Sequence, residues 1–146
     1  MHITKRPAVA SDTELARSVH HRAYHEVVVR QYGLWDEEAQ DELFAAAWSA
    51  AAHEIIFCDD LPCGYMCVED RDGDIHLCEI VIDPEFQGKG VGTNILGEVI
   101  EYARMRQVPV RLRTHLMNRA AALYRRLGFQ ECGRTNSHVL MEWKSG

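Results

Sequence analysis

The order of the predicted elements indicates an α/β fold. Apolar strands bounded by turn residues alternate with helical segments, in the order strand, two helices, three strands, helix, strand, helix and two strands. The chain has 146 residues, which is enough to bury one core and too few for two. Since no internal repeat or low-complexity linker divides it, we expect a single domain over residues 1–146.

The N-terminal part predicts a strand followed by two helices. Residues 2–6 form the short strand, and Ser11 is the expected N-cap of the first helix, with Glu14 in the capping-box position. This first helix ends near Gly33, and Asp36 opens the second helix. The predicted apolar face of the second helix consists of Leu43, Phe44, Ala47 and Trp48.

A hairpin and a central strand follow along the chain. Residues 55–58 and 63–69 form the hairpin strands, joined by a turn at residues 59–62. The Asp-Gly pair in the turn at residues 70–74 leads into the central strand, residues 75–83. The remaining elements are a helix beginning at residue 91, a strand at 109–114, a helix at 119–127 capped by Gly128, and closing strands at 129–134 and 138–143.

Three glycines, Gly88, Gly90 and Gly92, separate the central strand from the next helix. Glycine lets a ligand approach the backbone closely, and the first turn of a helix offers unpaired N–H groups and the positive end of the helix dipole. This turn therefore predicts an anion site. The even glycine spacing does not fit the dinucleotide fingerprint, and Lys89 lies between two glycines, which does not fit a P-loop.

The glycine-rich turn is part of a longer set of matching residues. Gln87, Gly90 and Gly92 fit the pattern Gln/Arg-x-x-Gly-x-Gly/Ala, preceded by Ile-Val-Ile-Asp-Pro at residues 80–84 and followed by Leu-Tyr-Arg-Arg-Leu-Gly-Phe at residues 123–129. On these motifs the chain resembles the GNAT superfamily of N-acetyltransferases. The resemblance implies a mixed, mostly antiparallel central sheet of about seven strands with about four helices, splayed between strands 4 and 5.

The resemblance also implies acetyl-coenzyme A as the acetyl donor. Its pyrophosphate would accept hydrogen bonds from backbone amides in the turn, and its pantetheine arm would pair with the central strand as an added strand does. The implied contacts are Ile80, Val81, Ile82, Gln87, Gly88, Lys89, Gly90, Val91, Gly92 and Thr93. Asn118 is a further implied contact, although its place before a helix also suits a capping residue.

Acetyl transfer to an amine needs a base and an acid. Tyr124 occupies the general-acid position of the family, where it would protonate the departing thiolate. Glu79 is the first candidate for the base, because a carboxylate on an apolar strand is costly without a partner or a role. A structural pairing of Glu79 with Arg111 or Arg113 stays open as the alternative. His76 is the competing base, and strand alternation puts it on the face opposite Glu79.

The expected acceptor is a primary amine, with a small molecule favoured over a protein N-terminus or a lysine. By the resemblance, Tyr24, Tyr32 and Trp35 are candidate acceptor contacts, and core packing explains them equally well. We expect direct attack in a ternary complex, because none of the five cysteines has an activating neighbour. A non-catalytic module that binds or senses acyl-coenzyme A is the rival hypothesis, against which Glu79 and Tyr124 speak.

Composition narrows the remaining classes of partner. Lys and Arg total 16 against 22 Asp and Glu, and the net charge of −6 argues against a nucleic-acid partner. The sequence shows no signal core and no apolar run long enough to cross a membrane, so we expect a cytoplasmic protein with no membrane partner. Residues 139–143 would supply a strand edge for a homodimer.

The sequence predicts no metal site. The five cysteines lack metal-ligand spacing and are expected to be reduced and mostly buried. His21 and His25 share a helix face but lack a third ligand, so we expect solvated or pocket-lining histidines.

Overall fold

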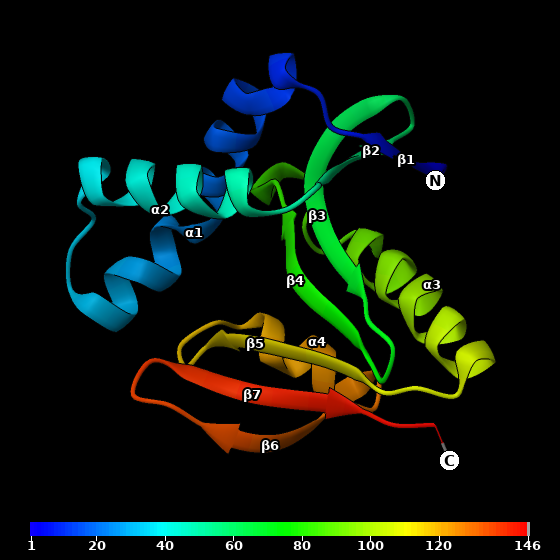
Figure 1. The fold of residues 1–146 in the computed structure, drawn as a ribbon. Coiled ribbons are helices and arrows are strands. Elements are labelled where there is room, and N and C mark those ends of the chain that lie inside the picture. Colours follow the sequence, from blue (N-terminus) through cyan, green and yellow to red (C-terminus); the bar gives the residue numbers. More distant parts are fainter. Residues whose placement is uncertain (146) are drawn as a thin grey trace. The chain divides into compact units, whose positions relative to one another are not determined.

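The computed structural model describes residues 1–145, which form two compact units (Figure 1). Unit 1 contains Met1–Cys67 and Glu79–Val91, and unit 2 contains Val68–Cys78 and the chain from Gly92 onward. The unit boundaries fall inside β3 (Leu61–Asp70), β4 (Ile75–Ile82) and α3 (Val91–Arg106), so each of these elements contributes to both units.

Unit 1 carries the N-terminal strands and two long helices. They are β1 (Ile3–Pro7), α1 (Thr13–Tyr32), α2 (Glu37–Ala50), β2 (Glu54–Cys58) and most of β3 (Leu61–Asp70), with short 3₁₀ helices at Ala10–Asp12 and Pro84–Phe86. β1 pairs with β2, and β2 with β3, in antiparallel fashion. Asp59 and Asp60 have φ of 49° and 69°, as the two central residues of a type I′ hairpin turn require.

The core of unit 1 lies where α1 and α2 pack on the strands. Its buried residues are Ala16, Val19, Phe44, Ile55, Tyr65 and Val81. The predicted apolar face of α2 is correct at Phe44, which is 4% exposed, and wrong at Leu43, which is 61% exposed. Neighbouring residues point about 100° apart around a helix, so only one of the two reaches the core.

The predicted cap of α1 is wrong. The N-cap position belongs to Asp12 instead of Ser11, and a 3₁₀ turn precedes it. The Asp12 carboxylate accepts hydrogen bonds from the Arg6 guanidinium at 2.7 Å and from the Val9 N–H at 2.8 Å. The bond from Arg6, followed by that from Val9, lowers the pKa of Asp12 to about 2. This buried carboxylate therefore joins β1 to the start of α1.

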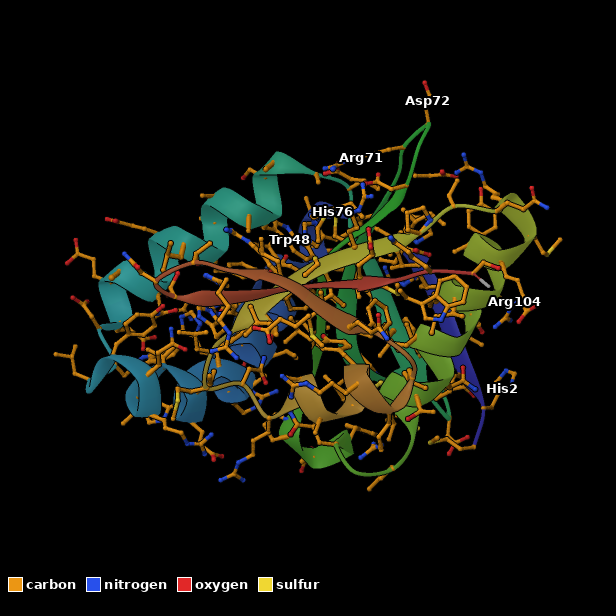
Figure 2. All side chains as sticks on the ribbon, turned by 90° about the horizontal axis from the view of Figure 1, so that it is seen from below. His2, Trp48, Arg71, Asp72, His76 and Arg104 are labelled. Atoms are coloured by element: carbon orange, nitrogen blue, oxygen red, sulfur yellow. The ribbon has the colours of Figure 1, made fainter. Side chains whose placement is uncertain are left out.

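Unit 2 holds the C-terminal strands and the last two helices. Its elements are the start of β4 (Ile75–Ile82), nearly all of α3 (Val91–Arg106), β5 (Val110–His115), α4 (Ala120–Arg126), β6 (Gln130–Arg134) and β7 (His138–Trp143). β4 pairs in parallel with β5, Ile75 with Val110 and His76 with Arg111, while β7 pairs antiparallel with β5 and β6. Arg71 and Asp72 lie at the tip of the hairpin between β3 and β4 (Figure 2).

The strand order β1-β2-β3-β4-β5-β7-β6 confirms the predicted sheet of seven strands, and residues 1–145 contain four α-helices. The predicted splay between β4 and β5 stays a prediction. β7 lies between β5 and β6, so the expectation that residues 139–143 form a free edge for a homodimer is wrong. Among residues 1–145, none of the helices combines the length and apolar character that crossing a membrane requires.

Candidate functional site

The glycine-rich turn adopts a backbone that favours glycine at two positions. Gly88 and Gly90 have φ of 75° and 86°, and both are exposed just before α3 begins at Val91. A Cβ added at Gly88 would meet nothing within 4 Å, so the positive φ, and not crowding, is the reason for glycine there. The Lys89 ammonium lies over the Phe86 ring at 5.6 Å. The turn thus exposes backbone and one cation at a helix N-terminus.

Side chains of unit 1 fasten this turn to β4. Gln87 Nε2 donates to the Ile82 carbonyl at 2.9 Å, which is a structural role for the residue that opens the motif. Asp83 accepts a hydrogen bond from the Glu85 N–H at 3.1 Å and forms an ion pair with Arg22 of α1. One lone pair of the Ile82 carbonyl is therefore already used, and the predicted pantetheine contacts along β4 stay predictions.

Glu79 is paired with a residue that the sequence analysis missed. Its Oε2 lies 2.9 Å from His53 Nε2, and the other ring nitrogen, Nδ1, lies 3.0 Å from the Ala51 carbonyl oxygen. The two side chains are 20% and 2% exposed, respectively. His53 lies just before β2 and belongs to no recognisable motif, and its partner is 26 residues away in the sequence. The one feature of the sequence that could have identified His53 was a polar residue placed just before an apolar strand.

The alternative pairing of Glu79 with Arg111 is wrong. The Arg111 guanidinium bonds Asp74 at 3.0 Å and Glu142 at 2.8 Å, all within unit 2. Both carboxylates sit near β5, where the sheet register brings Arg111 opposite Glu142. Arginine and carboxylate residues on neighbouring strands satisfy one another there, which leaves His53 as the partner of Glu79.

Aromatic rings surround the His53–Glu79 pair in unit 1. The His53 ring stacks on Trp48 with centroids 4.6 Å apart, and Tyr65 lies 5.6 Å from Trp48 and 5.9 Å from His53. Burial, followed by the charge of Glu79, raises the pKa of Tyr65 above its ordinary range. Among the described residues, the Tyr65 hydroxyl has no hydrogen-bond partner. Such a buried group costs about 1–3 kcal/mol.

The three aromatic residues predicted to contact the acceptor have different surroundings. Tyr24 is partly buried against the unit 1 core, with its ring 4.7 Å from that of His20. Trp35 donates from Nε1 to Glu37 at 2.6 Å, and Tyr32 is 52% exposed. Tyr24 also contributes to the raised pKa of Tyr65, whereas Trp35 belongs to a separate polar network between α1 and α2.

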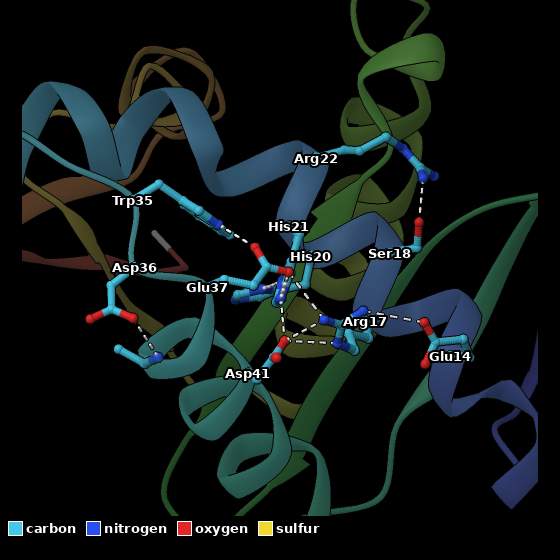
Figure 3. A network of polar contacts seen from close by, with 11 residues as sticks. Glu14, Arg17, Ser18, His20, His21, Arg22, Trp35, Asp36, Glu37 and Asp41 are labelled. Carbon is cyan, nitrogen blue, oxygen red and sulfur yellow. Dashed lines mark hydrogen bonds and ion pairs between the residues drawn. The ribbon is translucent and has the colours of Figure 1, made fainter.

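That network contains a group of residues with metal-binding donor types (Figure 3). His21, Glu37 and Asp41 bring donor atoms within 4.8 Å of one another. The Arg17 guanidinium bonds Asp41 at 2.7 Å and Glu37 at 3.1 Å, so a protein cation already neutralises both carboxylates. His25, predicted to share a face with His21, packs with its ring 5.2 Å from Trp35. The arrangement is that of a salt-bridge network joining two helices.

Unit 2 buries the predicted general acid. Tyr124 lies on α4, is 7% exposed, and has its ring 5.7 Å from that of Phe129. Burial raises the pKa of Tyr124 to about 12. Gly128, with φ of 101°, ends the helix as predicted, and the Phe129 N–H bonds the Tyr124 carbonyl at 3.0 Å. The motif around Tyr124 therefore fixes the position of its side chain within unit 2.

Two other predicted site residues also belong to unit 2. Burial, followed by the positive charge of Arg71, lowers the pKa of His76, which keeps its imidazole neutral and able to accept a proton. Asn118 Oδ1 accepts a hydrogen bond from the Ala120 N–H at 2.9 Å. Asn118 thus bonds the first residue of α4, but the N-cap position belongs to Arg119, so the predicted N-cap is wrong by one residue. The contact of Asn118 with the coenzyme stays a prediction.

The cysteines follow the sequence expectation with one exception. All five are free; Cys58, Cys63 and Cys67 are buried, whereas Cys132 is exposed on β6, one of the edge strands. Burial raises the pKa of Cys63 to about 11. A thiol of that kind is a poor nucleophile at neutral pH.

Comparison with known sequences gives the chain a family context. The sequence model described as "Acetyltransferase (GNAT) domain" matches residues 45–131. An uncharacterized N-acetyltransferase of Methanocaldococcus jannaschii is 34% identical over 107 residues, covering 70% of this chain and 45% of that protein. The N-alpha-acetyltransferase RimI of Mycobacterium tuberculosis is 43% identical over 54 residues, covering 37% of this chain and 34% of that protein. The matches span less than half the length of either relative.

Solved structures share the fold over nearly the whole chain. The PaiA N-acetyltransferase of Thermoplasma acidophilum, solved in complex with coenzyme A, gives a TM-score of 0.79 at 19% identity, covering 99% of this chain and 100% of that one. The ribosomal-protein-S18-alanine N-acetyltransferase of Escherichia coli gives 0.68 at 21% identity, covering 99% and 97%. At sequence identities this low, the comparison shows that these proteins share a fold with this chain.

Proposed function

The chain belongs to the GNAT family of acetyltransferases, and we propose that it transfers an acetyl group from acetyl-coenzyme A to a primary amine by direct attack. The fold neighbour solved with coenzyme A supports this class of donor. The raised pKa of Cys63 favours direct attack over an acyl-cysteine intermediate.

The turn between β4 and α3 carries the proposal. Its two glycines with positive φ leave exposed backbone at the first turn of a helix, which is the arrangement that binds a diphosphate. The residues proposed to hold the coenzyme are those of the turn and of the end of β4, namely Ile80, Val81, Ile82, Gln87, Gly88, Lys89, Gly90, Val91, Gly92 and Thr93. When bound, acetyl-coenzyme A supplies an activated carbonyl carbon.

The proposed proton-transfer residues are Glu79 as the base and Tyr124 as the acid. Glu79 in unit 1 takes a proton from the acceptor ammonium, which leaves the nitrogen lone pair free to attack. Tyr124 in unit 2 donates a proton to the departing thiolate, and its pKa of about 12 keeps the phenol protonated at neutral pH. His76 is the competing base, and its lowered pKa is compatible with that role.

A small primary amine is the proposed acceptor, and the net charge of −6 favours a cationic molecule. A protein N-terminus is the second candidate, favoured by the likeness to a relative named as an N-alpha-acetyltransferase. The non-catalytic binding module is disfavoured, because it gives no reason for a half-buried carboxylate held by a histidine.

A thiol-release assay tests this function. The protein is mixed with acetyl-coenzyme A and a panel of alkyl monoamines, diamines, a lysine peptide and a peptide with a free N-terminus, with an N-acetylated peptide as control. We expect thiol release that depends on an amine, with the acetylated product seen by mass spectrometry. Selective reaction of the free N-terminus would replace the small-molecule acceptor by the second candidate. Release at the same rate without an amine, or none with every amine, would contradict the proposed function.

A further inference from the structure

A buried hydroxyl in the core of unit 1 has no hydrogen-bond partner among the described residues. Tyr65 is 0% exposed, and its hydroxyl oxygen bonds no other group among residues 1–145. Buried polar groups in folded proteins are nearly always hydrogen-bonded, so an exception asks for an explanation. The raised pKa of Tyr65 means that this hydroxyl is neutral, with one proton to donate and lone pairs to accept.

The Tyr65 hydroxyl lies near the pair formed by His53 and Glu79. The Tyr65 and His53 ring centroids are 5.9 Å apart, and His53 Nε2 is 2.9 Å from Glu79 Oε2. A carbonyl oxygen can only accept, so His53 Nδ1 must carry the proton that it shares with Ala51. Nε2 is then the nitrogen that shares a proton with Glu79. His53 thereby fixes one oxygen of the carboxylate and leaves the other as the proton acceptor.

We propose that Tyr65 and Glu79 form the subsite for the reacting nitrogen of the acceptor, with His53 as the residue that positions Glu79. The inference rests on the proposed acetyltransferase function and specifies the chemistry of the acceptor. A primary ammonium group offers positive charge to Glu79 and an N–H to the lone pairs of the Tyr65 hydroxyl. An alcohol offers no charge. The subsite therefore selects amines over alcohols.

The surroundings of this subsite contain few other titratable groups. Trp48 of α2 stacks on His53 and carries no charge. Tyr24 of α1 is close enough to influence Tyr65, and His20, also on α1, packs against Tyr24. Glu79 is thus the anion that the described contacts place beside Tyr65, which makes it the counter-ion for a bound ammonium.

Tyr65→Phe tests the hydroxyl directly, with Phe44→Leu as the control for loosened packing in the same cluster. Removing an unpaired buried hydroxyl is expected to leave the melting temperature of the free protein unchanged or raised, whereas Phe44→Leu lowers it. With the best amine of the panel, Tyr65→Phe is expected to raise KM for the amine about ten- to hundredfold and to leave KM for acetyl-coenzyme A unchanged.

His53→Gln tests the positioning role, since glutamine keeps an N–H donor but lacks the ring that reaches both Glu79 and the Ala51 carbonyl. With the best amine, kcat is expected to fall by about a hundredfold while KM for acetyl-coenzyme A stays as in the wild-type protein, because the carboxylate is no longer held in place. Phe44→Leu is expected to leave kcat within a few-fold of the wild-type value, roughly the effect of loosened packing alone. In ¹⁵N spectra of the free protein, Glu79→Gln should shift the His53 Nε2 resonance.

The outcomes separate this inference from the proposed function. A Tyr65→Phe protein that melts as low as Phe44→Leu, or that keeps the wild-type KM for the amine, would overturn the subsite. A kcat unchanged by His53→Gln would overturn the positioning role. Absence of turnover in the wild-type protein with every amine would overturn the proposed function instead, while the melting comparison still decides whether the hydroxyl is structural.

Discussion

The two units treat their buried titratable side chains differently. In unit 1, His53 and Glu79 are bonded to each other, so a carboxylate is held in the protein with a proton-sharing partner. In unit 2, burial is the largest influence on His115 and Tyr124: it lowers the pKa of the first to about 4 and raises that of the second to about 12. The carboxylate paired with a histidine in unit 1 thus contrasts with two groups of unit 2 whose pKa values are governed mainly by burial.

This difference shows that residue type alone does not decide a chemical role. His53 is buried and faces a carboxylate, whereas His115 is half-buried and lies near His138 and Arg113, which further lower its pKa. A carboxylate held by a histidine suits a base, and a buried phenol suits a neutral proton donor. The proposed roles of Glu79 and Tyr124 follow this division.

The largest expected effect on turnover comes from removing the Tyr124 hydroxyl, the proposed proton donor in unit 2. Tyr124→Phe should lower kcat by about 10²–10⁴-fold, the usual contribution of acid–base catalysis, with little change in affinity for acetyl-coenzyme A. Steady-state kinetics and a binding titration measure the two effects. Tyr102→Phe is the matched control, because Tyr102 is 48% exposed on α3. Unchanged turnover in Tyr124→Phe would remove this residue from the mechanism.

A smaller effect is expected from disturbing the strands that hold Glu79 in unit 1. A Cβ at Gly64 of β3 would lie 2.2 Å from the Val81 carbonyl oxygen, so Gly64→Ala must push β3 and β4 apart. Overpacking of this kind costs about 1–3 kcal/mol, or a melting temperature lower by roughly 3–10 °C. Gly97→Ala, where a Cβ meets nothing within 4 Å, is the control. Equal melting of the two variants would contradict the close approach of the strands.

Local sequence signals predicted most of the fold. Turn chemistry located the β2–β3 hairpin, glycines marked the ends of α1 and α4, and helical spacing indicated α3. The capping pattern failed at Ser11, because the N-cap position belongs to Asp12, whose carboxylate bonds Arg6 of β1 and makes no capping hydrogen bond to α1. A local sequence pattern does not show that a residue from a distant strand will bond the carboxylate.

The site was predictable where a motif carries it and not elsewhere. Gly88, Gly90 and Tyr124 lie in motifs whose spacing reflects local backbone needs, and the structure gives each a matching local environment. His53 and Tyr65 belong to no motif, and their importance arises from contacts with residues far along the chain. Contacts between residues on different strands depend on strand order and register, and neither can be read from the residue at a single position.

Calorimetric titration with acetyl-coenzyme A tests the central claim most directly, because every proposed role depends on the turn after β4 holding the diphosphate. We expect saturable binding by the wild-type protein. Affinity should be roughly five- to thirtyfold weaker in Gly90→Ala, whose positive φ of 86° an alanine adopts at a cost of about 1–2 kcal/mol. Gly97→Ala should bind as the wild type does. A folded wild-type protein that gives no heat, or a Gly90→Ala variant that binds equally tightly, would contradict the account.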